Sequence, residues 1–94
     1  MIPLADTARP RLADKARLKW DAVREKHLLL FPEGVLVLNQ TAHDVLALCD
    51  GRRAVAEIVK ALATQYASDA NAIAGDVKEI LQRLVEKSLV TLNE

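Results

Sequence analysis

Few residues in this chain of 94 have the types and spacing that catalysis or metal binding requires. The two histidines, His27 and His43, lack the spacing of metal ligands and have no adjacent cysteine, so no zinc site is expected. The single cysteine, Cys49, lies among aliphatic residues of a predicted helix. That setting favours a small buried hydrophobic residue over a nucleophile.

The remaining candidates for chemistry are serines and glycines. Ser68 and Ser88 fall at the ends of predicted elements, and neither lies in a nucleophile-elbow pattern. The three glycines, Gly34, Gly51 and Gly75, are too far apart to form a phosphate-binding loop. The sequence therefore predicts a protein that is not an enzyme and needs no metal or cofactor, so the question becomes what it binds.

Composition predicts one domain whose core consists of aliphatic side chains. Hydrophobic residues make up 51% of the chain and aromatic residues only 3%. The net charge is zero, but residues 1–30 hold seven basic and four acidic residues. This basic end either attracts an acidic partner or forms a solvated arm. No apolar run reaches the roughly 18 residues of a membrane span, and no signal peptide is recognisable, so we expect a cytoplasmic protein that does not bind membranes.

Three short strands are expected near the start of the chain. Residues 1–16 contain two prolines and scattered charges, which predict a flexible N-terminal arm or an irregular lead-in, and residues 17–94 are expected to form a single recognition domain. Strands are predicted at 17–21, 26–31 and 35–38. Pro32-Glu33-Gly34 provides the turn before the last of them, because proline cannot donate to a strand ladder and glycine tolerates a positive φ.

Three helices should follow, at about 41–49, 55–66 and 70–87. Asn39 or Thr41 can cap the first helix, and Ser68 or Asp69 can cap the third. The third helix has the clearest periodicity, with apolar residues at i, i+4, i+7, i+8, i+11 and i+12: Ile73, Val77, Ile80, Leu81, Leu84 and Val85. The predicted fold class is α+β and winged-helix-like, a three-stranded antiparallel β-meander followed by three α-helices. Residues 89–92 either add a short last strand or cover the core.

The last strand of the meander is apolar on both faces. A strand with one solvated face should alternate with polar residues, and the run from Val35 to Leu38 does not. Either its own domain covers both faces, or one face and the edge await a partner. An open edge of this kind suits an extended peptide that adds as a further strand.

An ordered set of short motifs lies between residues 17 and 92. The motifs are Leu-Lys-Trp-Asp at 18–21, Leu-Leu-Phe-Pro-Glu-Gly-Val-Leu-Val-Leu-Asn at 29–39, Leu-Cys-Asp-Gly-Arg-Arg at 48–53, Glu-Ile-Val at 57–59, Asp-Val at 76–77 and Lys-Ser-Leu-Val at 87–90. Together they resemble the PqqD family, the peptide chaperones of pyrroloquinoline quinone (PQQ) biosynthesis. Two positions depart from the pattern: Ala54, where Thr or Ser is common, and His27, where a larger aromatic residue is common.

The resemblance implies a partner, a role and a set of binding residues. Such proteins bind the precursor peptide PqqA by strand addition and present it to PqqE, a radical S-adenosylmethionine (SAM) enzyme. The implied peptide site lies between the last strand of the meander and the third helix. It comprises Val35, Leu36, Val37, Leu38, Asn39, Asp76, Val77, Ile80, Leu81 and Leu84. Some of these residues must also serve the core, and Asp76 is either a solvated helix residue or a partner for the peptide.

Two other functions and one assembly remain open. The domain could recognise the leader of a different ribosomally made peptide, or it could be a small winged-helix protein that binds DNA. The third helix carries three cations but also Asp76, Glu79 and Glu86, which disfavour contact with phosphates, so no nucleic-acid partner is expected. A free strand edge also permits a homodimer by strand exchange.

Overall fold

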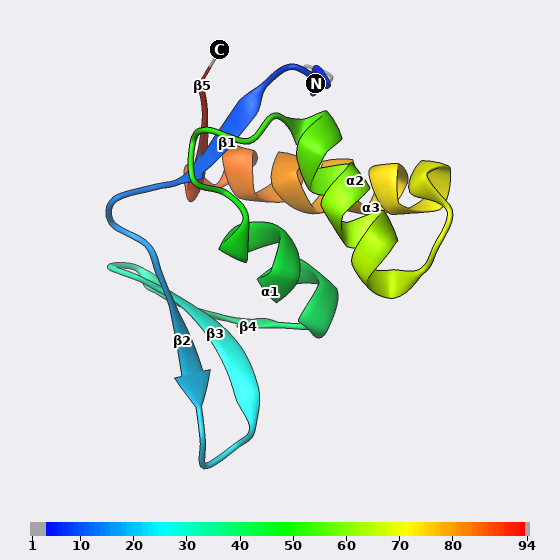
Figure 1. The fold of residues 1–94 in the computed structure, drawn as a ribbon. Coiled ribbons are helices and arrows are strands. Elements are labelled where there is room, and N and C mark those ends of the chain that lie inside the picture. Colours follow the sequence, from blue (N-terminus) through cyan, green and yellow to red (C-terminus); the bar gives the residue numbers. More distant parts are fainter. Residues whose placement is uncertain (1–3, 94) are drawn as a thin grey trace.

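A three-stranded antiparallel meander forms one layer of the fold, as the sequence predicts (Figure 1). The computed structural model describes residues 4–93, and all structural statements refer to these. The strands are β2 (Arg17–Asp21), β3 (Lys26–Phe31) and β4 (Gly34–Leu38), in the order β2-β3-β4. The Asp21 carboxylate accepts hydrogen bonds from the backbone N–H groups of Val23 and Arg24, which stabilises the turn between β2 and β3.

Three helices follow the meander and lie on one side of it (Figure 1). They are α1 (Gln40–Ala47), α2 (Val55–Tyr66) and α3 (Ala70–Glu86). Asn39 caps α1 by accepting from the Ala42 N–H at 2.8 Å, and Asp69 caps α3. At the start of α2, Ala54 has no capping side chain, but the Glu57 carboxylate accepts from the Ala54 N–H at 3.0 Å and supplies half of a capping box.

The N-terminal segment contains a strand, which differs from the flexible arm expected over residues 1–16. β1 (Arg9–Leu12) pairs antiparallel with β5 (Val90–Asn93) at the other end of the chain, and the two run side by side in Figure 1. Ala8 and Pro10 are buried in this contact. Long-range pairing across about 80 residues of sequence is the physical reason for the difference, because a local pattern does not encode it. Residues 1–3 of the expected arm lie outside the described residues.

The aliphatic core sits between the helices and the inner face of the meander. Leu29 from β3, Val45 from α1 and Ile58 from α2 are fully buried. On α3 the buried residues follow one stripe: Ile73, Val77, Leu81 and Leu84. The core thus holds α3 beside the meander, and a groove lies between α3 and β4.

Candidate functional site

Strand β4 is an edge strand whose outer edge forms no strand pairing in the described part of the chain. Its hydrogen-bonded neighbour is β3, on one side only. Its side chains alternate, so that Val35 and Val37 are exposed (52% and 60%) while Leu36 and Leu38 turn inward. The protein's own domain therefore does not cover both faces of this apolar strand: one face and one edge are open.

A shallow groove of about 270 Å³ runs between β4 and α3. Leu36 and Leu38 form one wall, and Ile80 and Leu84 form the other, with Ala42 of α1 between them. The complete lining is Leu36, Val37, Leu38, Asn39, Ala42, Ile80, Arg83, Leu84 and Lys87. An open strand edge beside an apolar groove can offer both backbone hydrogen bonds and side-chain pockets.

The two ends of the groove carry opposite charges. Near the C-terminal end of β4, a polar hollow next to the groove is lined by Asp76 and Glu79 together with Asn39. At the other end, Lys87 lies beside the start of the groove. Arg83 forms an ion pair with Glu79 at 2.7 Å, so the charges of these two largely cancel. Asp76 and Lys87 form no ion pair within residues 4–93, and they give the groove its polarity.

The predicted site residues fall into three groups. Those that line the groove or its polar end are Leu36, Val37, Leu38, Asn39, Asp76, Ile80 and Leu84. Val35 is exposed on the outer face of the strand. Val77 and Leu81 are fully buried and belong to the core beneath the groove, so they have a packing role in this structure, and their contact with a peptide stays a prediction. Their side chains support the α3 wall from behind.

Sequence reasoning missed several residues that line the groove. They are Arg83 of α3, Lys87 at the C-terminal cap of α3, and Ala42 of α1. Helical spacing offers the signal that would have found the α3 residues, since Asp76, Ile80, Arg83 and Lys87 follow at three- or four-residue intervals along one face. Ala42 gives no such signal, because its position depends on how α1 packs against α3 and β4.

The two histidines meet although they lie far apart in sequence. His27 stacks on His43 with ring centroids 3.8 Å apart and an interplanar angle of 18°, and the Trp20 ring lies tilted against His27 with centroids 4.7 Å apart. Ring lone pairs lie in the ring planes, so stacked imidazoles do not converge on one ion. Within residues 4–93, no cluster of three or more potential ligands is arranged to hold a metal.

Asp44 is the centre of a polar cluster that joins α1 to α2. Its carboxylate accepts hydrogen bonds from the Tyr66 hydroxyl and, at 2.9 Å, from the Gln40 amide, and it contacts His43 Nδ1 at 3.1 Å. Burial opposes its ionisation, but the hydrogen bonds from Tyr66, Gln40 and His43 outweigh burial and lower the pKa of Asp44. Burial and the bond to Asp44 together raise the pKa of Tyr66 to about 12. The cluster holds the two helices together.

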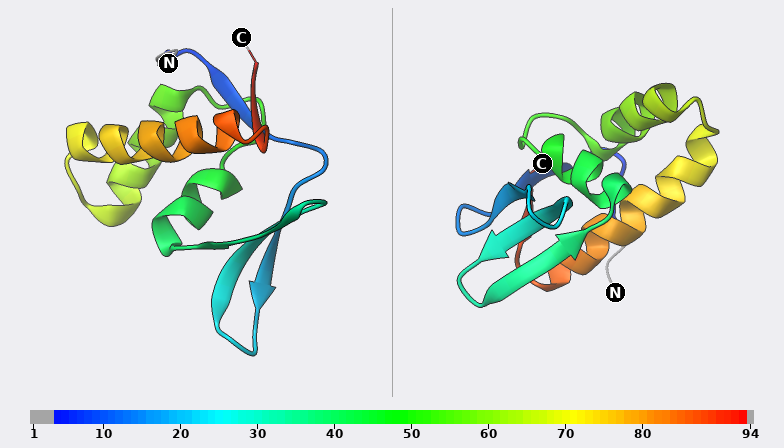
Figure 2. Two further views of the ribbon diagram at one scale, coloured as in Figure 1. Left: turned by 180° about the vertical axis from the view of Figure 1, so that it is seen from behind. Right: turned by 90° about the horizontal axis from the view of Figure 1, so that it is seen from below.

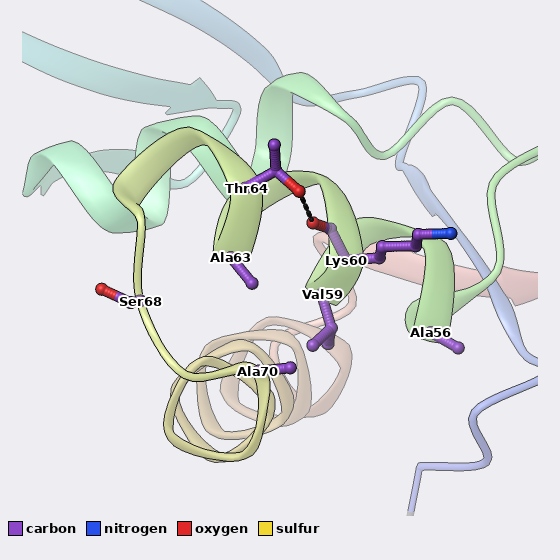
Figure 3. A pocket seen from close by; sticks show the side chains of 7 residues that line it. All are labelled: Ala56, Val59, Lys60, Ala63, Thr64, Ser68 and Ala70. Atoms are coloured by element: carbon purple, nitrogen blue, oxygen red, sulfur yellow. Dashed lines mark hydrogen bonds between the residues drawn. The ribbon is translucent and has the colours of Figure 1, made fainter.

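Other features of the described residues add no second site. A hollow between α2 and the start of α3 is lined mainly by small side chains, and its one helical hydroxyl, on Thr64, donates to the Lys60 carbonyl oxygen at 3.0 Å (Figure 3). Burial, aided by the nearby Asp50, raises the pKa of the Cys49 thiol to about 12 and keeps it protonated. No helix within residues 4–93 has the length and apolar composition to span a bilayer.

The fold and the groove together define a class of protein. An α+β domain of winged-helix character, with an open sheet edge beside an apolar groove, has the architecture of a peptide-recognition domain. The chain belongs to the PqqD family: the family model for coenzyme PQQ synthesis protein D matches residues 26–90. This is a family of non-catalytic peptide-binding chaperones. A PqqA binding protein from Rhodopseudomonas palustris (strain TIE-1) is 43% identical over 96% of this chain and 88% of its own length.

Solved structures agree with the family assignment. A solution structure of the PqqD part of Methylobacterium extorquens PqqCD, described as a stand-alone recognition element for ribosomally synthesised and modified peptides, matches with a TM-score of 0.81. It is 36% identical and covers 94% of both chains. TbiB1 in complex with the TbiA(beta) leader peptide shares the fold, with a TM-score of 0.71 at 21% identity over 85% of this chain and 93% of its own.

Proposed function

We propose that this domain binds the precursor peptide PqqA as a fourth strand along β4 and presents it to the radical SAM enzyme PqqE. The observation that carries the proposal is the groove between β4 and α3, which lies directly beside the unpaired edge of the strand. The names of the relatives support the identity of the peptide. The shared family supports the pathway.

Strand addition uses the two properties that the groove combines. Along the β4 edge, alternate backbone groups point away from β3 and are free to bond with a peptide. A peptide side chain that points inward at every second position would meet Leu36, Ile80 or Leu84. Affinity then comes mainly from the backbone and selectivity from the apolar wall, so no catalytic group is needed.

An antiparallel peptide is the arrangement that we favour, because antiparallel pairing is slightly more stable per residue than parallel pairing. β4 runs from the Lys87 end of the groove toward the Asp76 end, as its lining shows. The peptide would therefore enter at Asp76 and leave at Lys87. These two residues are 11 positions apart on α3, about 16 Å along the helix, which corresponds to about five residues of extended peptide.

Amide hydrogen exchange and calorimetry test the proposal together. Addition of PqqA should slow exchange at alternate amides of β4 and should leave β1 unchanged, because β1 is already bonded on both sides. Ile80→Asp should weaken binding by about tenfold or more, since it places a charge in an apolar contact. Ala61→Asp makes the same chemical change on an exposed part of α2 and should bind normally.

The same assay separates the proposal from its alternatives. If the domain ignores PqqA but binds the leader of another modified peptide through β4, the site stands and the peptide is wrong. If binding leaves the β4 amides unprotected, strand addition is wrong. Sedimentation without peptide tests whether the open edge pairs two copies, in which case PqqA should dissociate the dimer.

A further inference from the structure

The face of the meander opposite Leu36 and Leu38 is apolar, and of its residues only Val37 also borders the groove. Strand pairing places Val35 beside Leu30 and Val37 beside Leu28 on this outer face. The two valines are among the most exposed large hydrophobic residues of the described chain. When the molecule is seen from below, β3 and β4 lie in front of the helices (Figure 2, right). Residues of this kind, gathered on one face, are typical of an interaction site.

One border of this face is basic. The same two cross-strand rows continue onto β2, where Arg17 lies beside Leu30 and Lys19 lies beside Leu28. Lys26 is placed in the next row, beside Asp21. None of the three cations forms an ion pair within residues 4–93, and the Asp21 carboxylate already accepts two backbone bonds in the adjacent turn.

We infer that this outer face of the meander, defined by Arg17, Lys19, Leu28, Leu30, Val35 and Val37, docks a protein whose own contact patch is apolar and bordered by carboxylates. The two rows set the order of the contact: cations on β2, leucines on β3 and valines on β4. A partner must therefore place its carboxylates over β2 and its apolar residues over β3 and β4. Such complementarity raises the association rate and fixes the orientation of the complex.

Other occupants fit this face less well. A second copy of the chain would bring cations and valines but no free carboxylate, since Asp21 is engaged in the turn. An anionic membrane would gain only about 1 kcal/mol from each of three cations. The face carries no aromatic anchor of the kind that membrane-surface sites use, because Trp20 belongs to the opposite face, in the row of His27 and Leu38.

A peptide bound as proposed above would lie beside this outer face, and this step rests on that proposed function. A peptide added along β4 would extend the outer face by one strand, next to Val35 and Val37. The docking protein would then touch both the domain and the outward side chains of the peptide, and it should prefer the loaded domain to the empty one. For a peptide chaperone, the partner that needs this preference is the modifying enzyme.

Binding of the PqqE enzyme to the PqqA-loaded domain tests the inference. Arg17→Glu/Lys19→Glu should weaken this binding by about tenfold or more and should remove its salt dependence, because rim charges control association. Val35→Thr/Val37→Thr keeps β-branched side chains and should weaken binding through faster dissociation. The matched control, Arg52→Glu/Lys60→Glu, makes the same change of charge on exposed residues elsewhere and should bind normally. Circular dichroism confirms that each variant folds.

The outcomes separate this inference from the proposed function. The charge variant on β2 lies two strands from the peptide, so it should bind PqqA with unchanged affinity. If it also binds PqqE normally, the outer face is not the docking surface, whereas peptide binding at the groove still stands. If the wild-type face instead drives self-association or binding to vesicles of anionic lipid, the inferred occupant is wrong. Failure of PqqA itself to bind the wild-type domain would contradict the proposed function.

Discussion

Two strand edges in this molecule, one closed and one open, show how an edge becomes available to a partner. The closed edge is that of β1, which pairs with β5 on one side. On its other side it is bonded by the segment between α1 and α2: Gly51 N–H donates to the Pro10 oxygen at 3.0 Å, and Leu12 N–H donates to the Cys49 oxygen at 3.2 Å. The open edge is that of β4, which is bonded on one side only within residues 4–93.

The difference lies in what packs beside each strand and not in the strands themselves. The closed edge receives a loop of the same chain, which satisfies its backbone groups. The open edge faces α3 across a groove, and no segment within residues 4–93 pairs with it. An unpaired edge is normally a risk for aggregation, so its retention beside a shaped groove points to use by a partner.

The largest expected effect is on the free energy of unfolding, and it should distinguish the core side of α3 from its groove side. Leu81→Ala should reduce the free energy of unfolding by about 2–5 kcal/mol, because it opens a cavity beneath the α3 wall. Ile80→Ala, one residue away and half-buried, should cost less stability and weaken peptide binding more. Chemical denaturation and calorimetry measure both quantities. A stable Leu81→Ala domain that has lost peptide binding would show that Leu81 lines the groove after all.

Each of the two regions contains a glycine whose substitution should have a different effect on stability. Gly51 supports the closed edge at a φ of 78°, and a Cβ there would lie 3.0 Å from Asn93 Nδ2. Gly51→Ala should therefore destabilise the domain by about 1–2 kcal/mol. At Gly34 on the open strand, a Cβ would meet only the Phe31 ring at 3.8 Å, so Gly34→Ala should change stability by less than about 0.5 kcal/mol. Denaturant titrations compare the two, and equal losses would contradict the difference.

Charge at the ends of the groove should affect the direction of the peptide. Two peptides of equal composition are needed, one with a Lys before and a Glu after its apolar residues, and one with these charges exchanged. The first should bind more tightly by roughly 1.4- to 5-fold per pair, the range of exposed ion pairs. Asp76→Lys/Lys87→Glu should reverse the preference, as measured by calorimetry at low salt. No reversal would mean that the groove does not sense charge, and a wild-type preference for the second peptide would mean that the peptide runs parallel to β4.

The smallest expected effect is on the stability of the domain in acid. It arises where α1, the helix that follows the open strand β4, contacts α2. The pKa of Asp44 is lower in the folded state than the usual value of about 3.9 in an unfolded chain. Its stabilisation is therefore complete above that value and is lost as pH falls through the folded-state pKa. Asp44→Asn should lower Tm at pH 7, and the difference from wild type should shrink below about pH 4. Asp14→Asn, at a highly exposed carboxylate, is the control.

Much of the fold could be predicted from local patterns. The strands at 17–21 and 26–31 and the helix at 55–66 begin and end where expected, and the other predicted elements differ by one or two residues at an end. Alternation and helical spacing are local properties, so neighbouring residues suffice to reveal them. The motifs that resemble the PqqD family were equally visible, and the family assignment is confirmed.

The site could be predicted only in part, because helical spacing does not say which side of a stripe faces the core. Ile80 and Leu81 are adjacent and equally apolar, yet one lines the groove and the other is fully buried. A rotation of α3 by about 100°, the angle between successive residues, would exchange their roles. Only the packing of α3 against α2 and the meander sets that rotation.

By itself, then, the amino-acid sequence determined the types and order of the central elements, the aliphatic composition of the core and the family, since each depends on short-range patterns or motifs. The tertiary structure alone decided that β1 joins β5, that His27 meets His43 and that β4 keeps an open edge beside Ile80. These features depend on contacts between segments far apart in sequence, and such contacts form only when the whole chain packs.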